Sequence, residues 1–143
     1  MTLPMRLPLI LLAPLLLTGC FIETATYSID PLTDHAITLR VEKENFWTKE
    51  GTLRVTMSRL PECQRQLELG SVWLSGLQVE LFGNGNNVYT LRADDQAWQI
   101  DTTDCTGQEA PDADAITGLP LGIFELGDDN KLTFEKPEAS TGE

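Results

Sequence analysis

The segment LQVELFGNGNNVYTLRADDQAWQID, residues 77–101, predicts an antiparallel meander of three strands. Apolar and polar side chains alternate along it, and Leu77, Val79 and Leu81 fall on one face, which is the period of a half-buried strand. Residues 83–87 are all Asn or Gly, which tolerate positive φ and therefore predict a turn. Asp94-Asp95 predicts the next turn. We expect strands at residues 77–82, 88–93 and 97–101.

The same alternation extends upstream and downstream of this meander. Residues 36–43 and 52–60 alternate and predict a hairpin, and residues 122–126 and 131–136 predict another across the turn at 127–130. Residues 64–69 fit a strand or a short helix, and we favour a strand. The segment between the meander and the last hairpin is expected to be irregular. Short strands separated by turns predict an all-β fold, a small antiparallel sandwich or barrel.

The N-terminus has a different character. An apolar run at residues 7–17 follows the single charge of Arg6 and ends in Leu17-Thr18-Gly19-Cys20. A positive start, an apolar stretch and small residues at the end are the parts of an export signal. Pro residues interrupt the run, which disfavours a permanent transmembrane helix because Pro breaks helices. The four residues before Phe21 resemble the lipobox of bacterial lipoproteins.

This resemblance implies a location. In lipoproteins of this kind the Cys sulfur, here that of Cys20, receives a diacylglyceryl group, and the chain is cut before that Cys and acylated on its new amine, often with palmitate. The resemblance also implies outer-membrane sorting, because Phe21 stands where Asp would favour the inner membrane. We expect a signal peptide at 1–19, a lipid-anchored tether at 20–35, a β domain at 36–137 and a flexible tail at 138–143. The alternative is an ordinary secretory signal, with Cys20 free or paired by chance.

Two further cysteines, Cys63 and Cys105, remain if Cys20 is lipidated. Two cysteines in an exported chain most simply form a disulfide bond. A metal site is a poorer interpretation, because no CxxC motif is present and the only histidine, His35, is distant in sequence. We therefore predict one disulfide.

The charge is strongly acidic and unevenly distributed. The formal net charge of −12 includes Arg6, and residues 94–143 hold 13 acidic side chains against two lysines. This balance disfavours a nucleic-acid partner, because phosphate binding needs Lys and Arg. It favours a cationic partner, with a merely solvating face as the alternative. The candidate residues lie in two loops expected to be exposed: Asp112, Asp114, Asp128 and Asp129.

The sequence favours a binding role over catalysis. It contains no GxSxG, HExxH or P-loop motif. A carboxylate pair could come from four aspartates that are close in sequence, but such residues more often form turns. The four are Asp94, Asp95, Asp101 and Asp104. The loop oxygens near Asp112 and Asp128 would suit Ca²⁺, yet neither loop fits an EF-hand. We expect no enzyme, no metal and no cofactor.

Aromatic residues supply the remaining candidates. Trp47, Trp73 and Trp98 are expected mainly in the core, Trp98 above all, because it lies on an alternating strand. Phe46 and Trp47 lie in a polar loop and are the candidates for partner recognition.

Three functional hypotheses follow. The first is an outer-membrane lipoprotein, facing the periplasm, that serves as a non-enzymatic binding or assembly subunit for an envelope protein. The second is a periplasmic inhibitor or ligand-binding module for a cationic protein such as a lysozyme, because some lysozyme inhibitors are similar small disulfide-bonded β lipoproteins. The third is a carboxylate-based glycan hydrolase.

Overall fold

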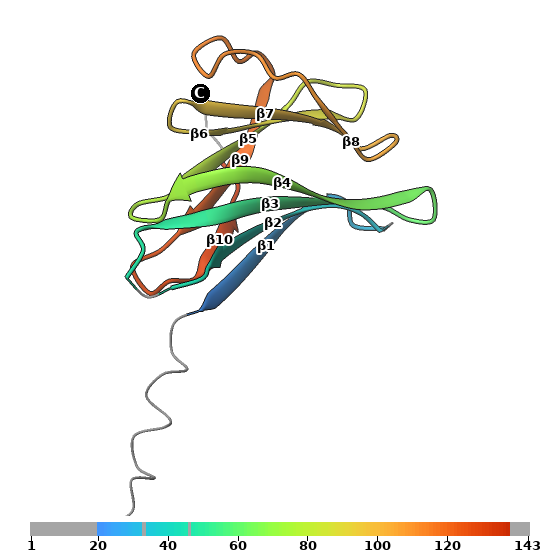
Figure 1. Cartoon of the computed structure of the whole chain (residues 1–143). Coiled ribbons are helices and arrows are strands. Elements are labelled where there is room, and N and C mark those ends of the chain that lie inside the picture. The colour runs from blue at the N-terminus through green and yellow to red at the C-terminus, as the bar shows by residue number, and fades with distance from the viewer. Residues whose placement is uncertain (1–19, 33, 46, 138–143) are drawn as a thin grey trace, which may run out of the picture.

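A computed structural model describes residues 20–32, 34–45 and 47–137. The predicted signal peptide at 1–19, the predicted tail at 138–143 and Phe46 lie outside these residues. Ten strands and no helix occur in the described chain (Figure 1). The strands are β1 (Phe21–Asp30), β2 (His35–Lys43), β3 (Glu50–Arg59), β4 (Cys63–Trp73), β5 (Gln78–Gly83), β6 (Val88–Ala93), β7 (Gln96–Asp101), β8 (Thr106–Gln108), β9 (Leu119–Leu126) and β10 (Leu132–Glu135).

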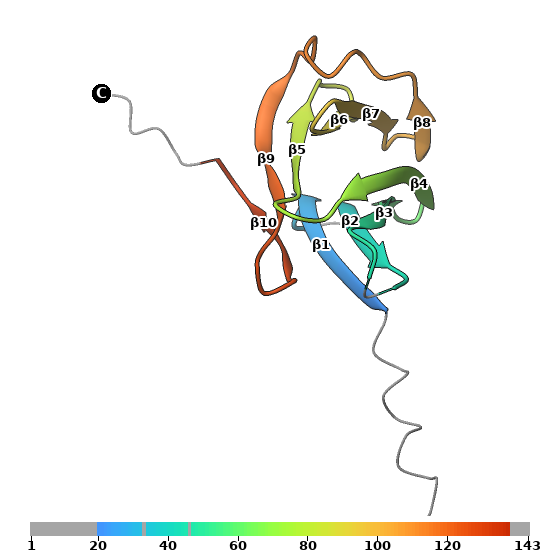
Figure 2. The ribbon, with the colours of Figure 1, turned by 60° about the vertical axis from the view of Figure 1, so that its left-hand side comes forward.

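The strands form two antiparallel sheets. The first has the order β1-β2-β3-β4, and the second has the order β10-β9-β5-β6-β7-β8. In Figure 2 the second sheet curves over the first, with β10 beside β1 on one side and β8 facing β4 on the other. The expected all-β antiparallel fold is thus confirmed in its sandwich form. The meander is confirmed as β5-β6-β7, and the last hairpin is confirmed as β9-β10.

The sequence prediction was wrong about the tether. Residues 21–30 form β1, which pairs along its length with β2, so the folded domain begins at Phe21 and not at residue 36. The Thr and Ser residues that suggested a tether form the outward face of the strand. Its inward side chains, among them Ala25 and Tyr27, pack against the core, and the Tyr27 ring lies 5.2 Å from that of Phe134 in β10. A strand with polar and apolar faces is stable here because the second sheet covers the apolar face.

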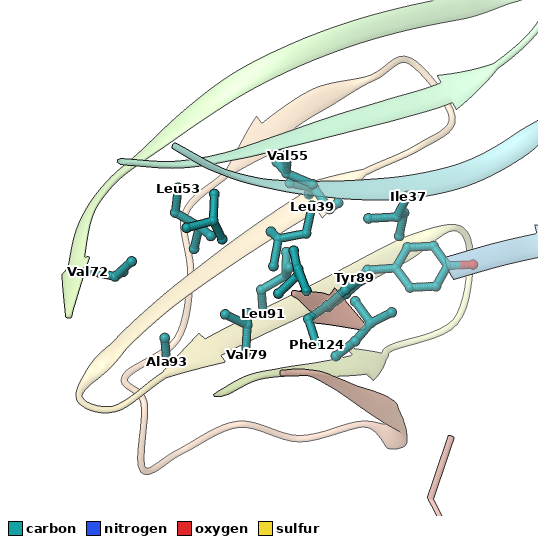
Figure 3. Close-up of a cluster of buried hydrophobic side chains, with 14 of the residues drawn as sticks. Ile37, Leu39, Leu53, Val55, Val72, Val79, Tyr89, Leu91, Ala93 and Phe124 are labelled. Atoms are coloured by element: carbon teal, nitrogen blue, oxygen red, sulfur yellow. The ribbon is translucent and has the colours of Figure 1, made fainter. Parts of the chain in front are cut away.

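The core lies between the sheets. Leu39, Leu53 and Val55 point from the first sheet toward Val79 and Leu91 of the second (Figure 3), and these five side chains are fully buried. Burying an aliphatic side chain of this size contributes roughly 1.5–3 kcal/mol each. The alternation predicted from the sequence is therefore the pattern that holds the two sheets together.

Strand β4 is an edge strand of the first sheet, and side chains of β7 form hydrogen bonds with its backbone. The Trp98 indole Nε1 donates to the Leu69 carbonyl at 3.0 Å, and the Gln96 amide donates to the Ser71 carbonyl at 3.3 Å. Near the other end of β4, Cys63 is bonded to Cys105, with an S–S distance of 2.00 Å. This confirms the predicted pairing. The bridge and the two hydrogen bonds close the side of the sandwich and protect an edge that could pair with another chain.

The preference for a strand at residues 64–69 is also confirmed, but β4 extends further, to Trp73. The ladder between β3 and β4 shifts register between Leu53 and Arg54, opposite Gly70, whose φ is 129°. This β-bulge inserts one residue and reverses which side chains face inward. Before it Leu67 and Leu69 face inward, and after it Val72 is buried while Trp73 is exposed.

Candidate functional site

Cys20 marks one end of the sandwich, which we call the anchor end. It comprises Cys20, the β2–β3 connection at residues 44–49, the β4–β5 turn at 74–77 and the β9–β10 turn at 127–131. In Figure 1 the connection and both turns lie toward the lower left, where the chain enters β1. Cys20 is exposed and is the free cysteine of the chain, since the other two form the disulfide.

Two tryptophans line an open hollow at the anchor end. The hollow has a volume of about 700 Å³, and its walls include Phe21, Trp47, Trp73 and Asp128, each from a different part of the chain. Trp47 is 67% exposed and Trp73 is 55% exposed. The expectation that these two side chains belong to the core is therefore wrong. Trp47 is a surface residue, as the predicted role in recognition would require.

The exposure of Trp73 was not expected from the sequence. Continued alternation from Leu67 and Leu69 would place Trp73 on the inward face, and only the bulge at Gly70 turns it outward. The Gly in mid-strand was the available signal, because an isolated Gly within a strand pattern often marks a bulge. Trp98 is half-buried and packs against the core, closer to its expected role.

Charges of both signs surround the aromatic hollow. Lys43 and Lys49 belong to its lining, while a second open hollow of about 430 Å³ shares Trp73 and Lys49 with three glutamates. The glutamates are Glu42, Glu44 and Glu50. The anchor end therefore presents aromatic surface among charges of both signs, with acidic side chains in the majority.

A separate acidic hollow lies against the second sheet. It has a volume of about 750 Å³ and brings Asp112 and Asp114 together with Asp94 and Asp95 of the β6–β7 turn, around Arg92. This grouping had no signal in the sequence, because Asp95 and Asp112 are 17 positions apart.

Arg92 holds the wall of the acidic hollow in place. Its Nε donates to Glu80 at 2.5 Å, its Nη1 donates to the Ala113 carbonyl at 3.0 Å, and its guanidinium lies 5.1 Å from the centre of the Phe82 ring. The hydrogen bond to Glu80 raises the pKa of Arg92, so the guanidinium keeps its charge. Glu80 neutralises this arginine, and the lining of the hollow contains no other Lys or Arg. The charge of the four aspartates is therefore not balanced by the residues that line the hollow.

The four predicted acidic residues fall at two separate places. All four are exposed, as expected. Asp112 and Asp114 line the acidic hollow, whereas Asp128 lines the aromatic hollow at the anchor end. Asp129 accepts a hydrogen bond from the Lys131 backbone amide at 3.1 Å, so it shapes the β9–β10 turn.

The aspartates considered for catalysis do not gather into one site. Asp94 and Asp95 precede β7, while Asp101 ends it, so the strand separates them. Asp101 accepts from the Thr103 amide at 2.8 Å, and Asp104 accepts from the Thr106 hydroxyl at 2.7 Å, which are turn-forming bonds. Within the described residues, no three His, Cys, Asp or Glu side chains are placed to hold a metal ion.

His35 is engaged in the structure of the domain. It opens β2, and its Nε2 lies 2.9 Å from the hydroxyl of Thr102, a fully buried residue. Burial lowers the pKa of His35 below its ordinary value of 6.5, and the charge of Arg59 lowers it further, while Asp30 and Glu62 act in the opposite direction. The imidazole is thus neutral at pH 7 and links the first sheet to the loop that carries the disulfide.

Comparison of the chain with protein-family models, with curated proteins and with solved structures finds no match. Within the described residues, no helix is both long enough and apolar enough to cross a bilayer.

Proposed function

We propose that this protein is an outer-membrane lipoprotein, anchored through Cys20, that serves as a non-enzymatic binding or assembly subunit in the cell envelope. One observation carries the proposal: the cysteine that completes the lipobox-like motif is the exposed, unpaired one, and the first strand begins at the next residue. The first described strand thus begins directly after the position where the motif predicts the cut. Two or three acyl chains at Cys20 would hold the domain stably at a bilayer that it does not span.

The test of anchoring compares the parent chain with Cys20→Ala in a bacterial host. We expect metabolic labelling with palmitate in the parent and no labelling in the variant, which should keep its leader or be cut elsewhere. Cys20→Ala leaves the strands and the disulfide unchanged, so a folded but unlabelled variant isolates the anchor. Labelling that persists in Cys20→Ala would contradict the proposal. Separation of inner and outer membranes then tests the predicted sorting.

The binding role is tested by capture of a partner. Crosslinking in intact cells, followed by purification from membranes, should recover one abundant envelope protein at reproducible stoichiometry. Recovery of the chain alone, at a crosslinker concentration that captures a known envelope complex in the same cells, would contradict a role as a subunit.

The second candidate function, a module that binds a cationic protein such as a lysozyme, is favoured by one observation. The fold brings Asp94, Asp95, Asp112 and Asp114 around a single hollow in which Glu80 already pairs with the arginine. A surface of this charge would accelerate encounter with a basic protein in a salt-dependent way. The matched test uses two double variants, because the structure separates the acidic loops.

Asp112→Asn with Asp114→Asn removes charge from the acidic hollow, and Asp128→Asn with Asp129→Asn removes the same charge from the β9–β10 turn. If the hollow binds a basic partner, the first pair should slow association and reduce its salt dependence, while the second pair should leave both near those of the parent. If the first pair and the parent associate at the same rate with the same salt dependence, the acidic loop serves only to keep the protein solvated. Both pairs should stay folded, because exposed charges contribute little to stability.

A further inference from the structure

We propose that the anchor end rests directly on the bilayer, with Trp47 and Trp73 seated at the membrane–water interface. This inference rests on the proposed lipidation of Cys20 and adds an orientation of the domain relative to the membrane. The interface consists of the aromatic hollow and its rim, and its occupant is phospholipid.

The anchor leaves almost no chain between the bilayer and the folded domain. Consecutive Cα atoms are about 3.8 Å apart, so a lipidated Cys20 holds Phe21 within one residue of the bilayer surface. Phe21 is paired with Lys43 in the β1–β2 ladder and lines the hollow that contains both tryptophans. A tether at residues 20–35 would have allowed the domain to stand away from the membrane, but β1 occupies most of that segment. The domain cannot leave the surface while its anchor stays inserted.

The exposed side chains at this end are of a kind that favours the membrane–water interface. Tryptophan is enriched where membranes meet water, because its ring is largely apolar and its N–H can hydrogen-bond to headgroups. Trp47 and Trp73 expose more than half of their surface beside the anchor, and Ile22, the second residue after it, is 47% exposed. Exposed apolar surface of this kind costs free energy in water, and contact with lipid removes that cost.

The charges make this contact mainly apolar. Lys43, Lys49 and Lys131 lie at or beside the anchor end, but acidic residues of the same segments outnumber them, five to three. The acidic residues are Glu42, Glu44, Glu50, Asp128 and Asp129. Anionic lipid should therefore not strengthen the approach, in contrast to a polybasic anchor.

The test separates geometry from biosynthesis. Residues 20–143 contain all ten strands, and Cys20 is their one free thiol, so a palmitoyl maleimide can attach a single chain there in vitro. The conjugate, labelled with 5-fluorotryptophan, is placed in phosphatidylcholine nanodiscs that carry a nitroxide on the headgroup. Trp→Phe variants assign the three fluorine resonances. We expect the resonances of Trp47 and Trp73 to be broadened and that of Trp98 to stay sharp.

Leu60→Trp supplies a matched control. Leu60 is 46% exposed and follows β3 at the end opposite to residue 49, about 36 Å away along the strand at roughly 3.3 Å per residue. Its added resonance should stay sharp. Broadening of all four resonances alike, or of none, would overturn the proposal, the latter pointing to a protein partner for this hollow.

Residence on vesicles gives a second readout. One acyl chain binds a bilayer only marginally, so a contribution from the aromatic residues becomes measurable. The conjugate with Trp47→Ala and Trp73→Ala should leave phosphatidylcholine vesicles several times faster than the parent conjugate, whereas Leu60→Ala should not. Equal release rates would contradict the proposal. The two proposals can fail separately. If cells do not lipidate the chain but the conjugate made in vitro behaves as expected, the proposed function is refuted and the membrane contact is still supported.

Discussion

The disulfide between Cys63 and Cys105 should supply a large part of the stability of the domain. The two residues are 42 positions apart, and their bridge closes a loop of that length in the unfolded chain. In the chain-entropy model such a loop lowers the entropy of the unfolded state enough to stabilise the fold by about 4 kcal/mol. Folded domains of this size are typically stable by only about 5–15 kcal/mol.

The position of the bridge makes this estimate applicable. Cys63 begins β4 in the first sheet, and Cys105 immediately precedes β8 in the second, so the bond crosses between the sheets. Cys105 is 1% exposed, and the hydroxyl of Thr102, three residues before it, forms a hydrogen bond with His35. Native contacts therefore keep both residues in place after reduction, and the main loss falls on the unfolded chain.

The assay is urea unfolding of residues 20–143 carrying Cys20→Ala, which removes the thiol that could exchange. The oxidised protein should unfold at a midpoint roughly 2–3 M higher than the reduced protein, for a slope of about 1.5 kcal/mol per molar urea. Cys63→Ala with Cys105→Ala should resemble the reduced form. A difference below about 1 kcal/mol, with both forms folded, would refute the reasoning, because the unfolded chain would then already hold the two segments together.

Three further outcomes follow from the same structure. Val79→Asp, midway along the buried face of β5, should destabilise the domain by several kcal/mol because it buries a charge without a partner, and thermal melting like that of the parent would show a wrong register. Since the pKa of His35 is lower in the folded state, the unfolded state binds more protons, and stability should fall as pH drops below 6.5; His35→Gln should reduce this loss in melts from pH 7 to pH 5. Arg92→Met should release the 109–118 loop, seen as faster amide exchange at Ala115, whereas Lys136→Met should not change it.

Much of the fold could be predicted because alternation is a local property. Val79 and Leu81 of β5, and Leu77 just before it, are buried on one side for the same reason that they stood out in the sequence: successive side chains of a strand point to opposite faces. Three of the Asn and Gly residues after β5 adopt the positive φ angles expected of them: Gly85 at 79°, Asn86 at 55° and Asn87 at 65°. The pairing of Cys63 with Cys105 was predicted from the count of cysteines, on the expectation that the chain is exported.

The candidate sites were harder to predict from the sequence, because they depend on which segments of the chain meet in the fold. Thr24 and Thr26 suggested a tether, and only pairing with β2 and cover from β10 make their segment a strand. The acidic hollow joins a hairpin turn to a loop through the hydrogen bonds of Arg92, a contact without a local signal.

The sequence by itself therefore determined the strand class, the meander, the disulfide and the motif that ends at Cys20. The tertiary structure alone decided that the domain begins at Phe21 and that Trp73 faces water. Strand propensity and alternation act between neighbours along the chain, so they can be recognised in one strand at a time. The bulge at Gly70 depends on the register of β4 against β3, and register is set by the whole sheet, so a one-residue shift moved a tryptophan from the core side to the surface.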